Sequence, residues 1–156
     1  MPNNRDPERV AAVVLKLSKE VSWKHDDDYV LWDSGATHTL LPSEALASLP
    51  DQDKKAAKII NLHLAAGSRE AVMINGEIYA RGVEQSICPV GRALRLLKAQ
   101  FNWTSSSCSV VFWSEGTEYL LTPLQVHKDL PYMTWSAFSM FRKAMKNPPK
   151  EGESLT

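Results

Sequence analysis

The chain has 156 residues, of which 44% are hydrophobic and 23% are charged, and this composition fits one globular domain rather than a disordered chain. Eighteen basic residues balance 18 acidic ones, so binding to nucleic acid through an overall basic excess is not expected. Two cysteines cannot form a disulfide scaffold, and the sequence has neither an apolar run long enough to span a bilayer nor a signal-peptide pattern at its start. We therefore expect an intracellular, cytoplasmic protein with no membrane contact.

The first predicted element is an amphipathic helix over residues 7–20. Asp6 is suited to the N-cap, Pro7 to the first helical position, and Glu8 to the positive end of the helix dipole. Apolar residues recur at helical spacing at Val10, Val13, Val14, Leu17 and Val21. We assign residues 1–24 to this helix and a linker.

A buried strand is predicted next, because residues 29–32 are apolar and rich in strand formers. A short capped helix is expected over residues 43–46, and alternation from residue 59 to 64 indicates a further strand. Asn75-Gly76 between two apolar runs predicts a β-hairpin, since both residues tolerate positive φ.

The second half of the sequence predicts a short helix, a hairpin and a terminal helix. The expected ranges are 91–98 for the first helix, 101–113 for the hairpin, 118–121 for a strand and 134–146 for the last helix. That last helix places Trp135, Phe138, Phe141 and Met145 on one face. None of the four histidines has metal-ligand spacing with a cysteine, so neither a metal nor a cofactor is expected.

The most informative segment follows the strand at 29–32. Asp33 stands at the end of an apolar strand, where a rigid element can control the orientation of a carboxylate. Ser34 can fix the loop by a hydrogen bond, and Gly35 allows a sharp turn. Asp33 is therefore the candidate catalytic residue, in a loop completed by Ala36 and Thr37.

This segment resembles the active-site motif of retropepsin-like aspartic proteases, in which two apolar residues precede Asp-(Ser/Thr)-Gly-(Ala/Ser). The longer string from Asp33 to Pro42 resembles protease segments of copia-type and related retrotransposon polyproteins. A second family feature is the apolar-apolar-Gly-Arg element before a short helix, and Gly91-Arg92 resembles it, 58 residues after Asp33. The alternative interpretation is that Gly91 makes a simple turn and Arg92 lies on the surface.

The resemblance implies a mainly β protein: a single, closed, retropepsin-like lobe of the acid protease fold over residues 25–125, with flanking N- and C-terminal helices. Residues 126–156 then form a C-terminal helix and a polar tail. It also implies a homodimer in which Asp33 faces its symmetry mate and Ser34 bonds across the interface. This agrees with the chemistry, because metal-free peptide hydrolysis by carboxylates needs two of them and this chain has one Asp-Ser-Gly. The implied substrate is an extended peptide in a polyprotein.

The family also uses a flap, a hairpin that closes over the substrate. The candidate tip is Ile74-Asn75-Gly76, and residues 65–68 are the alternative tip. Gly91 follows Gly76 by only 15 residues, whereas retroviral lobes place another hairpin there. Two further hypotheses therefore stay open: a catalytically inactive, retropepsin-derived module for dimerisation or peptide binding, and a β domain in which Asp-Ser-Gly is only a turn.

Overall fold

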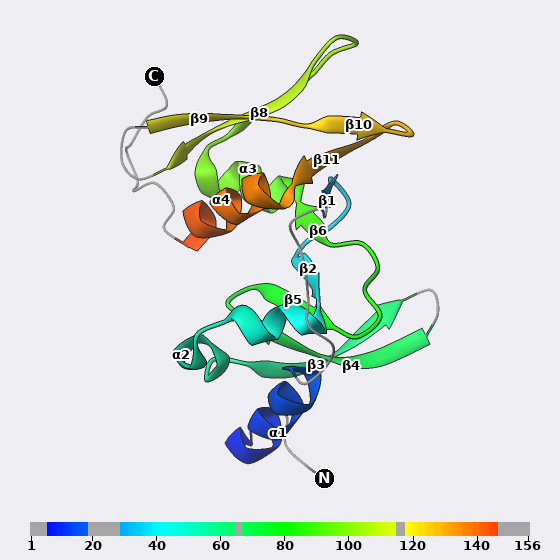
Figure 1. Cartoon of the computed structure of the whole chain (residues 1–156), viewed down its shortest axis with the longest axis vertical. Helices are drawn as coiled ribbons and strands as arrows, with labels where there is room; N and C mark the ends of the chain where they lie inside the picture. Colours follow the sequence, from blue (N-terminus) through cyan, green and yellow to red (C-terminus); the bar gives the residue numbers. More distant parts are fainter. Residues whose placement is uncertain (1–5, 19–28, 65–66, 115–117, 147–156) are drawn as a thin grey trace. The chain divides into compact units, whose positions relative to one another are not determined.

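The computed structural model describes residues 6–18, 29–64, 67–114 and 118–146, and this part of the chain is mainly β with helices before and after the strands (Figure 1). The chain divides into two compact units that alternate along the sequence. The first unit comprises residues 1–24 and 38–86, and the second comprises residues 25–37 and 87–156.

The first unit combines a four-stranded arrangement with three short helical elements. Its elements are α1 (Pro7–Ser18), β2 (Thr39–Pro42), the 3₁₀ helix η1 (Ser43–Ser48), α2 (Asp51–Lys54), β3 (Lys58–Leu64), β4 (Gly67–Ile74) and β5 (Glu77–Ala80). The strand order is β2-β5-β4-β3, with β2 and β5 parallel and the other pairs antiparallel.

Helix α1 begins where the sequence predicts. The backbone N–H of Glu8 donates to Asp6 Oδ1 at 3.0 Å, which confirms the predicted N-cap. The predicted apolar face is buried at Val10, Val13, Val14 and Leu17. Val21 and the predicted helical residues 19 and 20 lie outside the described residues.

The predicted Asn-Gly hairpin is confirmed. Asn75 and Gly76 have φ values of 51° and 83°, and the flanking Ile74 pairs with Glu77. All four residues of β5 are buried. The Tyr79 hydroxyl donates to Glu77 Oε1 at 2.9 Å, so a carboxylate is held inside this unit by a neighbour on the same strand.

The second unit contains two sets of strands and two helices. Its elements are β1 (Tyr29–Asp33), β6 (Ile87–Pro89), α3 (Val90–Leu97), β7 (Gln100–Trp103), β8 (Cys108–Ser114), β9 (Glu118–Pro123), β10 (Gln125–His127), β11 (Leu130–Thr134) and α4 (Trp135–Lys146). One set has the order β10-β11-β1-β6, in which β1 and β6 are parallel, and the other is the antiparallel sheet β7-β8-β9.

Aromatic side chains form the core of the second unit. Phe141 of α4 is fully buried; its ring centroid lies 4.2 Å from that of Phe112 and 5.5 Å from that of Trp32. Phe101 contacts Trp32 edge-on at 5.7 Å. Helix α4 therefore packs against both β1 and β8, which explains why the predicted aromatic face of this helix is buried at Trp135, Phe138 and Phe141.

The structure corrects the expectation of a closed β-lobe. In the described ranges no sheet closes into a barrel, because β3, β10, β7 and β9 each have only one neighbouring strand. The short helix expected at residues 43–46 is present as η1, but it begins after Pro42 with no side-chain cap.

Candidate active site

Asp33 is the last residue of β1, a strand that has neighbours on both sides. β1 pairs with β11 through Tyr29–Thr134, Val30–Met133 and Leu31–Tyr132. On its other side it runs parallel to β6, and Asp33 lies in register with Pro89. The half-buried Asp33 side chain therefore starts from a strand fixed by two backbone ladders.

The loop after β1 orients the Asp33 carboxylate. The backbone N–H of Gly35 donates to Asp33 Oδ1 at 2.8 Å, and that of Ala36 donates to the Asp33 carbonyl oxygen at 3.4 Å. A hydrogen bond from the backbone stabilises the charged carboxylate and fixes its rotation. The predicted site residues Ser34, Gly35 and Thr37 are exposed, and Ala36 is half-buried.

Gly35 also leaves space next to the carboxylate. A Cβ added to this glycine would lie 3.4 Å from Asp33 Oδ1, which is at the tight end of ordinary contacts. The bond to Oδ1 comes from the backbone N–H of Gly35, which any residue except proline could donate, and the missing side chain spares the carboxylate one further van der Waals contact.

The register of β1 and β6 places Pro89, two residues before Gly91, beside Asp33. β6 ends at Pro89, opposite Asp33, and α3 begins at Val90. Gly91 is exposed with open space where a Cβ would stand, and Arg92 is half-buried. Two segments separated by more than fifty residues thus meet at one end of the parallel strand pair.

An apolar strip lies on the same face of the sheet as Asp33. Side chains alternate along a strand, so Tyr29, Leu31 and Asp33 share one face of β1 while Val30 and Trp32 share the other. Tyr132 and Ile87 stand beside Leu31 on the neighbouring strands. Tyr29 is 43% exposed, and Leu31, Tyr132 and Ile87 are half-buried.

Sequence reasoning did not identify Tyr132 or Ile87 as part of this surface. β11 is far from β1 along the chain, and the three residues of β6 are too few to show a period. Ile87 could have been identified because it lies four residues before Gly91 of the Gly-Arg element. No feature of the sequence indicates that Tyr132 lies beside Leu31.

The predicted flap tip lies in the first unit. Ile74, Asn75 and Gly76 form the tight turn between β4 and β5, with Asn75 exposed. This turn has the geometry of a two-residue hairpin. The alternative tip at 65–68 includes residues 65 and 66, which lie outside the described residues; Gly67 and Ser68 begin β4.

The part of the chain that the structure describes contains no group of three His, Cys, Asp or Glu side chains that could hold a metal ion. Cys88 and Cys108 are both free and buried. Burial raises the pKa of the Cys108 thiol. Within the described ranges, no helix is long and apolar enough to cross a membrane.

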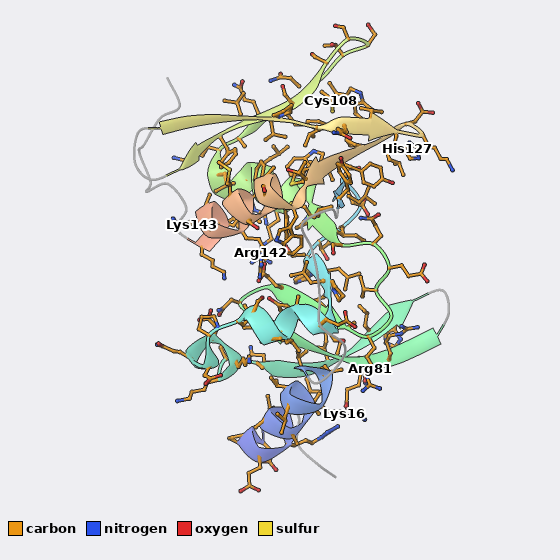
Figure 2. The ribbon with its side chains drawn as sticks, viewed as in Figure 1. Lys16, Arg81, Cys108, His127, Arg142 and Lys143 are labelled. Atoms are coloured by element: carbon orange, nitrogen blue, oxygen red, sulfur yellow. The ribbon has the colours of Figure 1, made fainter. Side chains whose placement is uncertain are left out.

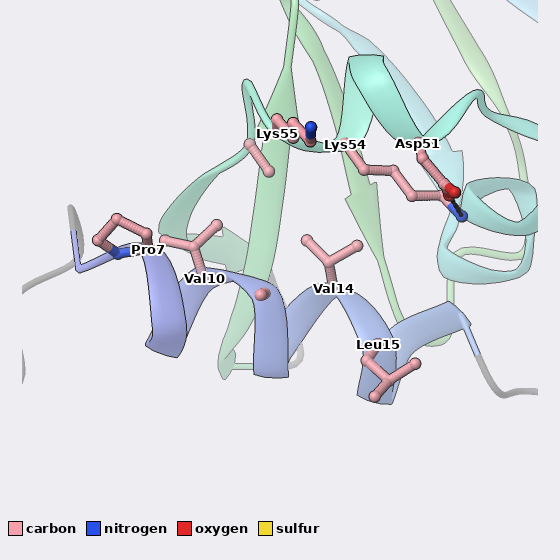
Figure 3. A pocket seen from close by; sticks show the side chains of 9 residues that line it. Pro7, Val10, Val14, Leu15, Asp51, Lys54 and Lys55 are labelled. Atoms are coloured by element: carbon pink, nitrogen blue, oxygen red, sulfur yellow. Dashed lines mark ion pairs between the residues drawn. The ribbon is translucent and has the colours of Figure 1, made fainter.

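A cavity of about 570 Å³ lies in the first unit, between α1 and α2 (Figure 3). Its wall is mostly apolar, with Val10 and Val14 on α1, while Asp51, Lys54 and Lys55 border it. Lys54 Nζ pairs with Asp51 at 3.8 Å. Asp33 does not line this cavity. The candidate active site is therefore the loop at the end of β1 and not the cavity.

No family model, curated protein or solved structure matches this chain. The site is therefore interpreted from its own geometry and from its sequence motif.

Proposed function

We propose that the protein is an aspartic endopeptidase that acts as a homodimer, with Asp33 of each copy supplying one carboxylate of the catalytic pair. The observation that carries this proposal is the position of Asp33: it ends a doubly paired strand, its Oδ1 accepts a hydrogen bond from Gly35, and Pro89 before the Gly-Arg helix lies in register with it. The motif resemblance and this local geometry point to the same residue.

The reaction needs two carboxylates because the two halves of peptide hydrolysis require opposite protonation states. One ionised Asp33 takes a proton from a water molecule, which attacks the carbonyl carbon of the peptide. The protonated Asp33 of the other copy donates to the substrate, and the C–N bond then breaks with a proton passing to the leaving amine. Two carboxylates held close together share one proton, since both cannot easily be ionised at once.

The apolar strip beside Asp33 supports an extended peptide as substrate. Tyr29, Leu31, Ile87 and Tyr132 offer partly exposed apolar side chains on the sheet face that carries Asp33. Peptides bound as strands are recognised through alternate side chains that enter such surfaces. A retrotransposon polyprotein is the substrate that the motif implies.

Cleavage of a peptide library at about pH 5, where a dyad holding one proton is active, tests the proposal. The wild-type chain should cleave, and Asp33→Asn should not, because the amide cannot take up a proton from water. Asp129→Asn is the matched control, because Asp129 is exposed at φ 65°, a conformation that asparagine also tolerates. Pepstatin should inhibit the wild type.

Equal cleavage by the wild type and Asp33→Asn would refute the proposal. So would a chain that light scattering shows to be a folded monomer that still cleaves, because one copy has one such carboxylate. A pH profile that is flat from about pH 4 to 8 would argue against a shared proton.

The alternative function is a catalytically inactive module, derived from a retropepsin, for dimerisation or peptide binding. The half-exposed apolar strip favours it, because a surface of this kind can bind a strand without any chemistry. If the protein is such a module, the wild type and Asp33→Asn should bind peptides equally well, and neither should cleave them.

A further inference from the structure

The two helices of the second unit carry a concentration of positive charge that the zero net charge of the chain conceals. Segments 85–114 and 130–146 contain no Asp or Glu. The same segments contain six basic residues: Arg92, Arg95, Lys98, Arg142, Lys143 and Lys146. These segments include α3, α4 and the strands β6, β7, β8 and β11, so both helices and these four strands lack negative side chains.

The basic residues belong to one layer because α3 and α4 pack against each other (Figure 1). Arg95, Lys98, Lys143 and Lys146 are exposed, whereas Arg92 and Arg142 are half-buried. Figure 2 shows Arg142 and Lys143 on the side of α4 that is turned away from the β7-β8-β9 sheet. The guanidinium of Arg142 lies 5.7 Å from the ring centroid of Phe138, and this contact orients it.

A simpler role explains part of this charge. Arg95, Lys143 and Lys146 lie in the last turns of their helices, where cations interact favourably with the helix dipole. The dipole does not account for the missing acidic residues at the opposite ends of the helices, where they would be equally favourable. Nor does it account for their absence from the four neighbouring strands.

We propose that the α3–α4 layer binds the phosphate backbone of nucleic acid, independently of base sequence. A repeating anion is the partner that several cations on two packed helices fit best, because each contact releases counterions from the polymer. The four exposed cations, Arg95, Lys98, Lys143 and Lys146, could contact about four phosphates. The four exposed cations are not among the residues that form the candidate active site.

The environment of α4 argues against the two other anionic partners. A helix that binds a lipid surface needs an exposed apolar face, but the aromatic face of α4 is buried in the core. An acidic protein partner would need an apolar centre in the interface, and Met140 is the single large apolar side chain of α4 that is substantially exposed, at 41%.

The test is binding of a fluorescent 20-nucleotide oligouridylate to the full chain, measured by anisotropy from 50 to 200 mM NaCl. Four contacts to a single strand predict a slope of about −3 in a plot of log affinity against log salt, or roughly 50-fold weaker binding over this range. Replacing the exposed cations (Arg95→Gln, Lys98→Asn, Lys143→Gln, Lys146→Gln) should weaken binding at 50 mM NaCl more than tenfold and flatten the slope. Asparagine is chosen at Lys98 because that residue has φ 51°.

The matched control removes four cations from the first unit: Lys16→Gln, Lys54→Gln, Lys55→Gln and Lys58→Gln. It has the same net charge as the α3–α4 variant and should keep the wild-type slope. The proposal is overturned if the two variants bind equally, if the wild type does not bind at 50 mM NaCl, or if it binds phosphatidylserine vesicles but not the oligonucleotide. If the fourfold variant does not fold, Arg95→Gln and Lys146→Gln singly should each reduce the slope by about 0.7.

Discussion

Replacing Phe141 with alanine should strongly destabilise the second unit. Its side chain is fully buried, stacked on Phe112 at 4.2 Å and within 5.5 Å of Trp32. Removing a buried phenylalanine side chain typically costs about 3–5 kcal/mol, to which lost aromatic contacts contribute. A domain of this size has a free energy of unfolding of only about 5–15 kcal/mol, so this one change removes a large share of it.

Urea unfolding followed by tryptophan fluorescence measures the effect, and Met140→Ala is the matched control. Met140 is the preceding residue on α4 but is 41% exposed, so its loss should change the free energy of unfolding by less than about 0.5 kcal/mol. The Phe141 variant should also melt roughly 10 °C lower than the wild type.

A loss below about 1 kcal/mol for Phe141→Ala, or equal losses for both variants, would refute the packing of α4 against β1 and β8. The consequence would reach the proposed site, because Trp32, which contacts Phe141, directly precedes Asp33 on β1.

Three further predictions concern the loop, the first unit and the thiols. Gly35→Pro should lower cleavage more than tenfold, because proline has no N–H to donate to Asp33 Oδ1, whereas Gly35→Ala keeps the N–H and adds only an ordinary 3.4 Å contact; equal cleavage by the two variants would contradict this. Tyr79→Phe should reduce the free energy of unfolding by about 1–3 kcal/mol, since it removes a hydrogen bond from the buried Glu77 carboxylate. Chemical denaturation measures this change, and a loss well below about 1 kcal/mol would contradict the prediction. The Cys108 thiol should react slowly with iodoacetamide at pH 8 until the chain is unfolded, because burial raises its pKa; labelling as fast as in urea would contradict its burial.

Local signals in the sequence predicted several elements correctly. The N-cap at Asp6, the spaced valines of α1 and the Asn75-Gly76 turn act over a few residues, and the structure contains all three. The aromatic face of α4 was also predicted, because aromatic residues spaced at the helical period of 3.6 residues lie on one face whatever the helix packs against.

The hairpin of β10 and β11 was not predicted. Its turn contains Lys128 and Asp129 with φ values of 51° and 65°, a conformation for which glycine or asparagine is the usual signal. β10 has three residues, all exposed, so it shows no alternation. β11 pairs with β1, which is distant in the sequence, and such pairing overrides local preference.

The candidate active site also combines local features that could be predicted from the sequence with long-range strand pairing that could not. The Asp33 loop could be predicted, because its hydrogen bonds join neighbouring residues. The register that places Pro89 beside Asp33, and Tyr132 beside Leu31, depends on strand pairing between segments far apart in the sequence. The closed lobe was expected only from the resemblance, and the open edges of the sheets correct it.

The most direct test of the central claim mixes wild-type and Asp33→Asn chains in increasing proportions and measures cleavage at constant total protein. If each active site needs Asp33 from both copies, a freely exchanging equal mixture should retain about a quarter of the wild-type activity, because random pairing makes only that share of dimers fully wild type. Activity that falls in simple proportion, to about half in the equal mixture, would show that each chain acts alone and would contradict a shared Asp33 pair.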